Sequence, residues 1–482
     1  MFWKGVWGYL PANIVQAIVG FASILVFTRL LTPEEFGQYA LGFTVMTLVH
    51  TCLFTWLEAA MARFWAAQKD QGSLADHFAT LYRAFLWLAA VFIPACAIGL
   101  WLWPADAGVK WAAAAGLSAI LARSVVRIAQ ERRRAAGLVG ASVRLDMTQS
   151  AGGFGFGAAF AFLGLGGSSP LLGLMVAALV CMPFALPQEL AAAKGGKLDW
   201  ARLKLYAAYG FPVSAAMILA LILASSDRFM IAYFLNEASV GAYHAAYSLS
   251  NRTLDIIFLW LGAAGGPAMV MALERGGHEA LVKAAREQVS TILLITVPAA
   301  AGLALVARPL AEVMVGEGLR DAAAQVTPWI ALAGFFGGLA THYLLQAFTL
   351  GHRTRLLLLA SCVPVVANLA LNATLIPRYG LIGAAWSTAA TYAFASAAYW
   401  TLGQRAVRLP IPLETLFKAG IATGLMAVAV MAVPAFGGIV ELLAKAGAGA
   451  LVYAIAALAL DVANIRAPAS RVFKAVQARW AT

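Results

Sequence analysis

The chain has 482 residues, of which 62% are hydrophobic and only 12% are charged, and its mean hydropathy is +0.81. This composition leaves too little polar surface for a water-soluble particle, so a lipid bilayer must be the solvent. The net charge of +12 is typical of basic loops beside anionic headgroups and does not require nucleic-acid binding.

Apolar segments recur along the chain at about 20 residues, the length with which a helix crosses about 30 Å of hydrocarbon. The sequence lacks the alternation of polar and apolar residues that marks a membrane barrel. The first segment continues past Lys4 without a cleavage site, so we expect it to remain as a span. We therefore predict an all-α polytopic membrane protein with fourteen transmembrane helices, or alternatively twelve. The predicted spans are 9–29, 39–59, 79–103, 110–130, 142–165, 169–186, 205–234, 240–264, 289–306, 326–348, 356–376, 381–402, 416–436 and 446–462.

The 34 Lys and Arg residues gather in alternate loops between these spans. Basic residues near span ends are retained on the cytoplasmic side of a membrane. With the amino terminus in the cytoplasm, most basic residues fall on that side, including the clusters at 123–144, 194–204 and 466–479. We therefore expect both termini to be cytoplasmic.

A short internal repeat relates the first and seventh predicted spans. Pro11 corresponds to Pro212, and the Gly37 and Tyr39 that follow the first span recur as Gly241 and Tyr243. The repeat predicts two six-helix lobes, 1–200 and 201–408, with an extra helix pair and a basic tail at 409–482. Because six is even, both lobes enter the membrane in the same sense, as in carriers whose substrate path lies between two lobes.

Three stretches resemble the Wzx-type polysaccharide flippases of the multidrug, oligosaccharidyl-lipid and polysaccharide exporter superfamily. They are TRLLTPEEFGQY at 28–39, DRFMI at 227–231 with VGAY at 240–243, and NLALN at 368–372 with LIPRYGLIGAA at 375–385. The resemblance implies two lobes around a central cavity that opens by alternating access. It also implies a multi-pass protein of the bacterial inner membrane that works beside a glycan polymerase and glycosyltransferases. Its cargo would be a lipid-linked oligosaccharide, such as an undecaprenyl-pyrophosphate-linked O-antigen or exopolysaccharide repeat unit.

A flippase moves an anionic headgroup through a region of low dielectric constant, so it needs cations along a wet cavity. Arginine suits this role because its guanidinium binds phosphate oxygens in pairs and stays charged at any depth. Arg252 lies near the middle of a predicted span, with Asp255 three residues later on the same face; the alternative is that the two form a structural pair. Arg29 and Arg228 end the first spans of the two lobes, where the alternative is that they extend to the outer interface.

Four further residues complete the predicted site. Arg63 and Arg83 flank the cytoplasmic loop after the second span and are expected to guide the headgroup or to anchor that loop. Glu58 and Asp146, like Asp255, are carboxylates within or near spans that either couple transport to an ion or pair with a base.

Signatures of catalysis are missing from the sequence. The four cysteines and six histidines show no metal-ligand spacing, and no phosphate-binding loop is present. We therefore expect a transporter rather than an enzyme, without a metal or cofactor. The alternatives are an ion-coupled drug or cation exporter with an acidic cavity, a membrane-embedded glycan polymerase or ligase, which needs a large outer loop, and a non-catalytic component of a polysaccharide assembly complex.

Overall fold

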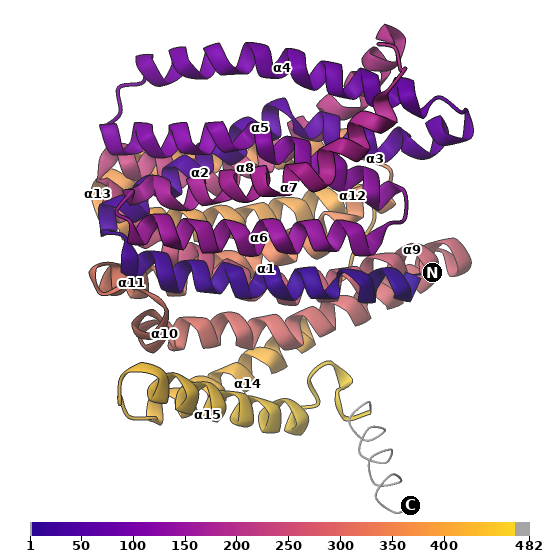
Figure 1. Ribbon diagram of the computed structural model, residues 1–482. Helices are drawn as coiled ribbons and strands as arrows, with labels where there is room; N and C mark the ends of the chain where they lie inside the picture. Colours follow the sequence, from indigo (N-terminus) through magenta and orange to yellow (C-terminus); the bar gives the residue numbers. More distant parts are fainter. Residues whose placement is uncertain (1, 468–482) are drawn as a thin grey trace, which may run out of the picture. The chain divides into compact units, whose positions relative to one another are not determined.

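The computed structural model describes residues 2–467, which fold into helices without any strand (Figure 1). They form two compact units that divide between His244 and Ala245. Ten helices are long and apolar enough to cross a membrane, or eleven if a bent pair counts as one span. The predicted all-α, multi-span architecture is confirmed.

The first unit is a bundle of helices joined by short loops. Helix α6 packs against α1 and α7, and α5 packs against α2 and α7 (Figure 1). The helices are α1 (Phe2–Leu30), α2 (Pro33–Leu53), α3 (Thr55–Asp70), α4 (Leu74–Leu102), α5 (Ala107–Ala135), α6 (Val139–Phe162), the 3₁₀ turn η1 (Gly166–Ser168), α7 (Ser169–Ala193) and α8 (Trp200–Phe234).

The stretch 28–39 forms the turn between α1 and α2. Thr32 caps α2 by accepting from the Glu35 backbone N–H, and the Glu35 carboxylate accepts from the Thr32 N–H at 2.9 Å. This reciprocal arrangement satisfies two donors that a helix start leaves unbonded. One turn later, a Cβ at Gly37 would lie 1.8 Å from the carbonyl oxygen of Glu237. The glycine of this motif is therefore needed for close backbone contact.

The second unit begins within the long helix α9 (Glu237–Leu305). Gly277, with φ of 64°, interrupts α9, and Gly380, with φ of 59°, interrupts α13 (Thr354–Gly403). Glycine favours these left-handed conformations because it has no Cβ. Each of these two long helices therefore contains two of the predicted spans. The remaining elements are α10 (Ala307–Met314), α11 (Glu317–Leu339), the π-helix η2 (Ala340–Leu344), α12 (Gln346–Leu350), α14 (Leu413–Ala432), α15 (Gly438–Ala459) and the 3₁₀ turn η3 (Val462–Asn464).

The structure differs from the predicted elements in three places. The span expected at 39–59 is broken at Phe54, where α2 and α3 meet with a bend of 46°. The short helix α10 was not predicted, because eight residues with a charged face carry no membrane-span signal. The compact units divide at 244, whereas the lobes were expected to divide at 200 and 408, and those lobe boundaries stay a prediction.

The last two helices, α14 and α15, lie side by side at the end of the second unit (Figure 1). The Tyr453 hydroxyl of α15 donates to the Leu294 carbonyl oxygen of α9 at 2.5 Å. The Glu312 carboxylate of α10 accepts from the Gly438 N–H at the start of α15, at 2.8 Å. The helix pair is thus hydrogen-bonded to the rest of its unit at two places, one on α9 and one on α10. Most of the basic tail at 466–479 lies outside the described residues.

Candidate functional site

Two arginines of α5 line a small cavity inside the first unit. Arg123 and Arg127 are one helical turn apart and therefore share a face. With Phe43, Met46, Thr47, His50 and Ile120 they surround about 110 Å³. Arg123 is half-buried, whereas Arg127 is exposed at the mouth. We call this cavity, which α2 and α5 form, the arginine pocket.

The cations of the arginine pocket are not neutralised by direct ion pairs. Arg123 Nη1 lies 3.7 Å from the Met46 sulfur, and among residues 2–467 no carboxylate oxygen lies within 4.0 Å of Arg123 or Arg127. The nearby carboxylate of Glu58 instead lies 2.9 Å from His50 Nε2. A half-buried guanidinium without a bound anion is energetically costly unless a ligand or water satisfies it.

The bend at Phe54 explains why Glu58 reaches His50. The Phe54 ring is fully buried and packs against Phe85 and Phe92 of α4, with ring centroids 5.6 and 5.7 Å away. This aromatic contact fixes the point where α2 ends and α3 begins. The carboxylate on the first turn of α3 is thereby held against the last turn of α2.

Of the predicted residues of the first lobe, the structure brings only Glu58 to the edge of this pocket. Arg63 is exposed on α3. The Arg83 guanidinium donates to the Gly196 carbonyl oxygen at 3.4 Å, and that of Arg29 donates to the Leu25 carbonyl oxygen at 2.8 Å. Asp146 accepts from the Gln16 amide at 2.6 Å. None of these four side chains lines the arginine pocket.

Arg228 belongs to a different cluster, at the junction of α2, α8 and the start of α9. It is buried, and it donates to His244 Nδ1 at 3.2 Å and to the Ala224 carbonyl oxygen at 2.8 Å. The neighbouring Asp227 is fully buried and accepts from the Tyr243 hydroxyl at 2.7 Å.

The same cluster reaches α2 through ring contacts. The His244 ring lies 5.7 Å from that of Phe36 and 5.9 Å from that of Tyr39. The stretches 28–39, 227–231 and 240–243, which are far apart in the sequence, therefore meet in space.

Arg252 and Asp255 lie on α9 in the second unit, and both are exposed. Within the described part of the chain, no ion pair shorter than 4.0 Å joins them. Their assignment as headgroup ligand and coupling carboxylate stays a prediction.

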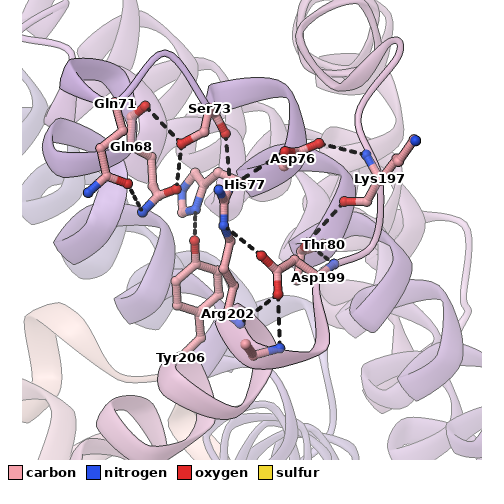
Figure 2. Close-up of polar contacts among 11 residues, drawn as sticks. Gln68, Gln71, Ser73, Asp76, His77, Thr80, Lys197, Asp199, Arg202 and Tyr206 are labelled. Carbon is pink, nitrogen blue, oxygen red and sulfur yellow. Dashed lines mark hydrogen bonds and ion pairs between the residues drawn. The ribbon is translucent and has the colours of Figure 1, made fainter.

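A second polar cluster of the first unit joins the α3–α4 turn to the segment that leads into α8 (Figure 2). The His77 Nδ1 lies 2.6 Å from the Tyr206 hydroxyl, and both residues are fully buried. We call this cluster the linker clasp. Its residues are Ser73, Asp76, His77, Thr80, Lys197, Asp199, Arg202 and Tyr206.

The charged side chains at the start of α8 have hydrogen-bond or ion-pair partners within the linker clasp. Asp199 caps α8 by accepting from the Ala201 N–H at 2.9 Å, and it pairs with Arg202 at 3.0 Å. Arg202 also donates to the Ser73 carbonyl oxygen at 3.1 Å, and Asp76 accepts from the Lys197 N–H at 2.8 Å (Figure 2). The clasp therefore fastens the segment 194–199, which leads into α8, to the turn between α3 and α4.

A third cluster centres on Glu189 of α7, whose side chain is fully buried. It pairs with Arg132 of α5 at 2.8 Å and accepts from the Tyr82 hydroxyl of α4 at 3.2 Å. Arg133 donates to the Phe184 carbonyl oxygen at 3.2 Å. The basic cluster at 123–144 was assigned to topology alone, yet these two arginines help to join three helices. Glu189, a carboxylate three residues past the predicted span 169–186, was the signal that could have revealed the pair.

The second unit carries a large apolar groove between α9, α14 and α15. It encloses about 780 Å³, and its walls include Leu294, Pro298, Met426, Val430 and Tyr453. Its charged lining residue, Lys445, pairs with Glu441 at 2.5 Å. Nothing in the sequence distinguished this groove from ordinary helix packing.

A sequence profile of polysaccharide biosynthesis proteins matches residues 26–324, which is more than half of the chain. The chain belongs to the polysaccharide biosynthesis protein family. The matched region includes the arginine pocket, the linker clasp and the Glu189 cluster.

Solved structures of a flippase and of multidrug transporters share the fold of this family member. The lipid II flippase MurJ in an inward closed conformation is 13% identical with a TM-score of 0.76, over 94% of this chain and 98% of that one. An inward-facing multidrug resistance MATE transporter is 15% identical with a TM-score of 0.63, over 81% and 94%. A mutant of the Vibrio cholerae MATE transporter VcmN is 16% identical with a TM-score of 0.57, over 84% and 96%. No curated protein matches the chain.

The family match and the shared fold confirm the resemblance found in the sequence, and the long apolar helices agree with a multi-pass membrane protein. No group of three or more potential metal ligands occurs in the described part of this family member.

Proposed function

We propose that this polysaccharide biosynthesis protein flips a lipid-pyrophosphate-linked oligosaccharide from the inner to the outer leaflet of the bacterial cytoplasmic membrane, by alternating access. The arginine pocket is the observation that carries the proposal. It offers two cations that form no direct ion pair with the described residues, and the Glu58 carboxylate lies 2.9 Å from His50 instead.

A pyrophosphate fits this arrangement for two physical reasons. Guanidinium groups bind phosphate oxygens with paired, charge-assisted hydrogen bonds that are roughly twice as strong as neutral ones. The half-buried Arg123 is also partly desolvated, which costs free energy. Binding an anion would offset that cost, whereas an arginine that is already paired with a carboxylate would gain less from the same anion. The cavity is small, so it would receive part of a diphosphate rather than a whole sugar.

The apolar groove of the second unit supports a lipid-linked cargo. Lipid tails are as apolar as the side chains of these spans, so close packing in a groove, rather than removal from water, would hold a hydrocarbon chain there. The similar fold of a lipid II flippase also supports a cargo of this kind.

An ion-coupled drug or cation exporter is the second candidate, since MATE transporters share the fold. Such an exporter needs an acidic binding cavity. Two arginines and a histidine line the arginine pocket and no carboxylate does, which disfavours a cationic substrate. A non-catalytic role in a polysaccharide assembly complex would give no reason to keep these cations unpaired.

The other predicted residues enter the proposal as a second set of headgroup ligands. They would contact the headgroup at other points of its path, and they are Arg252, Arg29, Arg228, Arg63 and Arg83. The carboxylates of Asp255, Glu58 and Asp146 would either couple transport to an ion or pair with a base. With both termini in the cytoplasm, glycosyltransferases would supply the cargo on that side, and a polymerase would take it on the other.

The test measures the sidedness of the lipid-linked oligosaccharide in cells with and without the protein, using a membrane-impermeant glycan-labelling reagent. We expect the unlabelled cytoplasmic pool to accumulate without the protein and in cells that carry only Arg123→Ala. Arg144→Ala, which changes an exposed arginine of α6, is the matched control and should restore export. Unchanged sidedness in cells without any flippase for this glycan would overturn the proposal.

A further inference from the structure

A third cavity lies in the second unit, where the two segments of α9 face each other near the break at Gly277. It encloses about 280 Å³. Trp260 and Gly265 line it from the first segment, and Glu287, Gln288 and Thr291 line it from the second. We call it the tryptophan pocket. It shares no lining residue with the arginine pocket or the apolar groove.

Gln288 places an unused hydrogen-bond acceptor at this pocket. Its side chain is only 8% exposed, and its Oε1 has no hydrogen-bond partner among the described residues. Its Nε2 lies 3.4 Å from the His342 carbonyl oxygen. A Cβ at Gly265 would lie 2.2 Å from the Gln288 amide carbon, so glycine is needed for the amide to pack there. A buried acceptor without a donor costs about 1–3 kcal/mol, which a ligand hydroxyl would recover.

The wall behind Gln288 is held in place by the π-helix η2. The His342 carbonyl oxygen also accepts from Gln346 Nε2 at 2.6 Å. The His342 ring stacks on the Phe258 ring, with centroids 5.7 Å apart and planes inclined by 15°. Single π-helical turns occur often at functional sites, because they redirect side chains and carbonyl groups.

The other lining groups present an aromatic face beside a carboxylate and a hydroxyl. Trp260 is 67% exposed, and Glu287 and Thr291 are also exposed. A pyranose ring has an apolar C–H face that packs on an aromatic ring and hydroxyl groups at its edge that donate to carboxylate and amide oxygens. A quaternary ammonium would also be attracted to the tryptophan and the carboxylate, but it has no N–H or O–H to give to the Gln288 oxygen.

We propose that the tryptophan pocket binds one pyranose ring of the oligosaccharide and thereby selects the glycan. The inference rests on the proposed function and names a sugar-recognising part of the same cargo path. Trp260 stacks on the ring, while Glu287 and Gln288 accept from its hydroxyl groups. In the expected orientation the pocket lies toward the cytoplasmic ends of both α9 segments, where the sugars stand before translocation.

The experiment measures binding of soluble methyl pyranosides to the purified protein in nanodiscs by saturation-transfer NMR. The probes are methyl glycosides of glucose, galactose, rhamnose and N-acetylglucosamine, with tetramethylammonium as the cationic probe. The variants are Trp260→Ala, Trp260→Phe and Glu287→Gln. Trp400→Ala is the matched control, because Trp400 lies near the end of α13 and is 42% exposed.

We expect at least one glycoside to bind, with about tenfold weaker binding to Trp260→Ala, the factor that corresponds to about 1.4 kcal/mol. Glu287→Gln should also weaken binding, while Trp260→Phe should keep most of it and Trp400→Ala all of it. Absence of glycoside binding, equal binding by Trp260→Ala and Trp400→Ala, or binding of tetramethylammonium alone would overturn the inference. Normal flipping together with any of these results would refute the sugar site and leave the proposed function standing. Glycoside binding without flipping would refute only the proposed function.

Discussion

The linker clasp and the arginine pocket are both polar clusters of the first unit, but their charges are satisfied differently. In the clasp, Arg202 pairs with Asp199 and also donates to a backbone carbonyl oxygen. In the pocket, Arg123 and Arg127 have no ion pair with any described residue, and the Glu58 carboxylate lies against His50 instead.

This difference separates structure from function. A cluster whose charges are paired restrains the chain and gains little from a charged ligand. A cluster that holds partly desolvated cations without bound anions loses stability and is ready to gain free energy from an anionic ligand. Substitutions in the two clusters should therefore change stability in opposite directions.

The largest expected effect on stability comes from substitution of Glu189. Its cluster, like the linker clasp, holds a paired charge, but its carboxylate is fully buried. Glu189→Ala leaves Arg132 without its partner, and removing one member of a buried pair costs about 3–5 kcal/mol. We expect a large fall in the thermal unfolding midpoint of the purified protein. The control is Glu131→Ala, which breaks a pair with Arg134 whose side chains are 25% and 41% exposed. Equal midpoints for the two variants would contradict the assignment.

The next effect concerns the arginine pocket. Arg123→Ala should reduce transport by about tenfold or more, because a hydrogen bond to a charged group contributes roughly 1.5–3 kcal/mol. Its unfolding midpoint should stay the same or rise, because a costly cation has been removed. Arg123→Lys should transport at an intermediate rate, since lysine keeps the charge but loses the paired geometry. A clear fall in the midpoint of Arg123→Ala would show a structural role instead.

The linker clasp should respond in the opposite way. Tyr206→Phe leaves the buried His77 without the hydroxyl 2.6 Å away, which should cost about 1–2 kcal/mol. Transport per folded molecule should remain normal, as measured by flipping activity normalised to folded protein in the same membranes. The double variant His77→Leu with Tyr206→Phe should lose less stability than the sum of the single changes, because both buried polar groups are gone. Strict additivity would show that the two side chains do not interact.

The smallest effect concerns the contact between α10 and α15. Two hydrogen bonds hold the pKa of the Glu312 carboxyl below its ordinary value of 4.5. The larger contribution comes from the Gly438 N–H and the smaller one from the Arg308 side chain. A lowered pKa stabilises the folded state above the unfolded pKa, and that stabilisation is lost as the pH falls through the folded pKa. Hydrogen exchange of α10 and the start of α15 should therefore quicken below about pH 4.5 beyond its intrinsic change, and Glu312→Gln should remove this dependence. The same pH profile in both proteins would contradict it.

Much of the fold was predictable because the length of an apolar segment directly reports a membrane span. The predicted spans correspond to helices or to helix segments, and the motif at 28–39 begins a helix as its capping residues indicate. The bend at Phe54 was not predictable, because it depends on rings of α4 that pack on it.

The candidate site was less predictable, because residues that are adjacent in the sequence contact different residues in the folded structure. Asp227 and Arg228 are adjacent in the sequence, but they bond to two different residues, Tyr243 and His244. Arg123 and Arg127 were assigned to topology from their place near a span end. Their spacing of one helical turn was a signal of a shared face, but only the packing of α5 on α2 shows what that face meets.

The most direct test of flipping uses the purified protein in liposomes that carry a lipid-pyrophosphate-linked oligosaccharide in the inner leaflet. A membrane-impermeant glycan-labelling reagent then reports how much cargo reaches the outer leaflet. We predict that labelling rises with time in liposomes with the wild-type protein and stays near the protein-free level with Arg123→Ala. Labelling by the wild-type protein that does not exceed the protein-free level would contradict the proposed function.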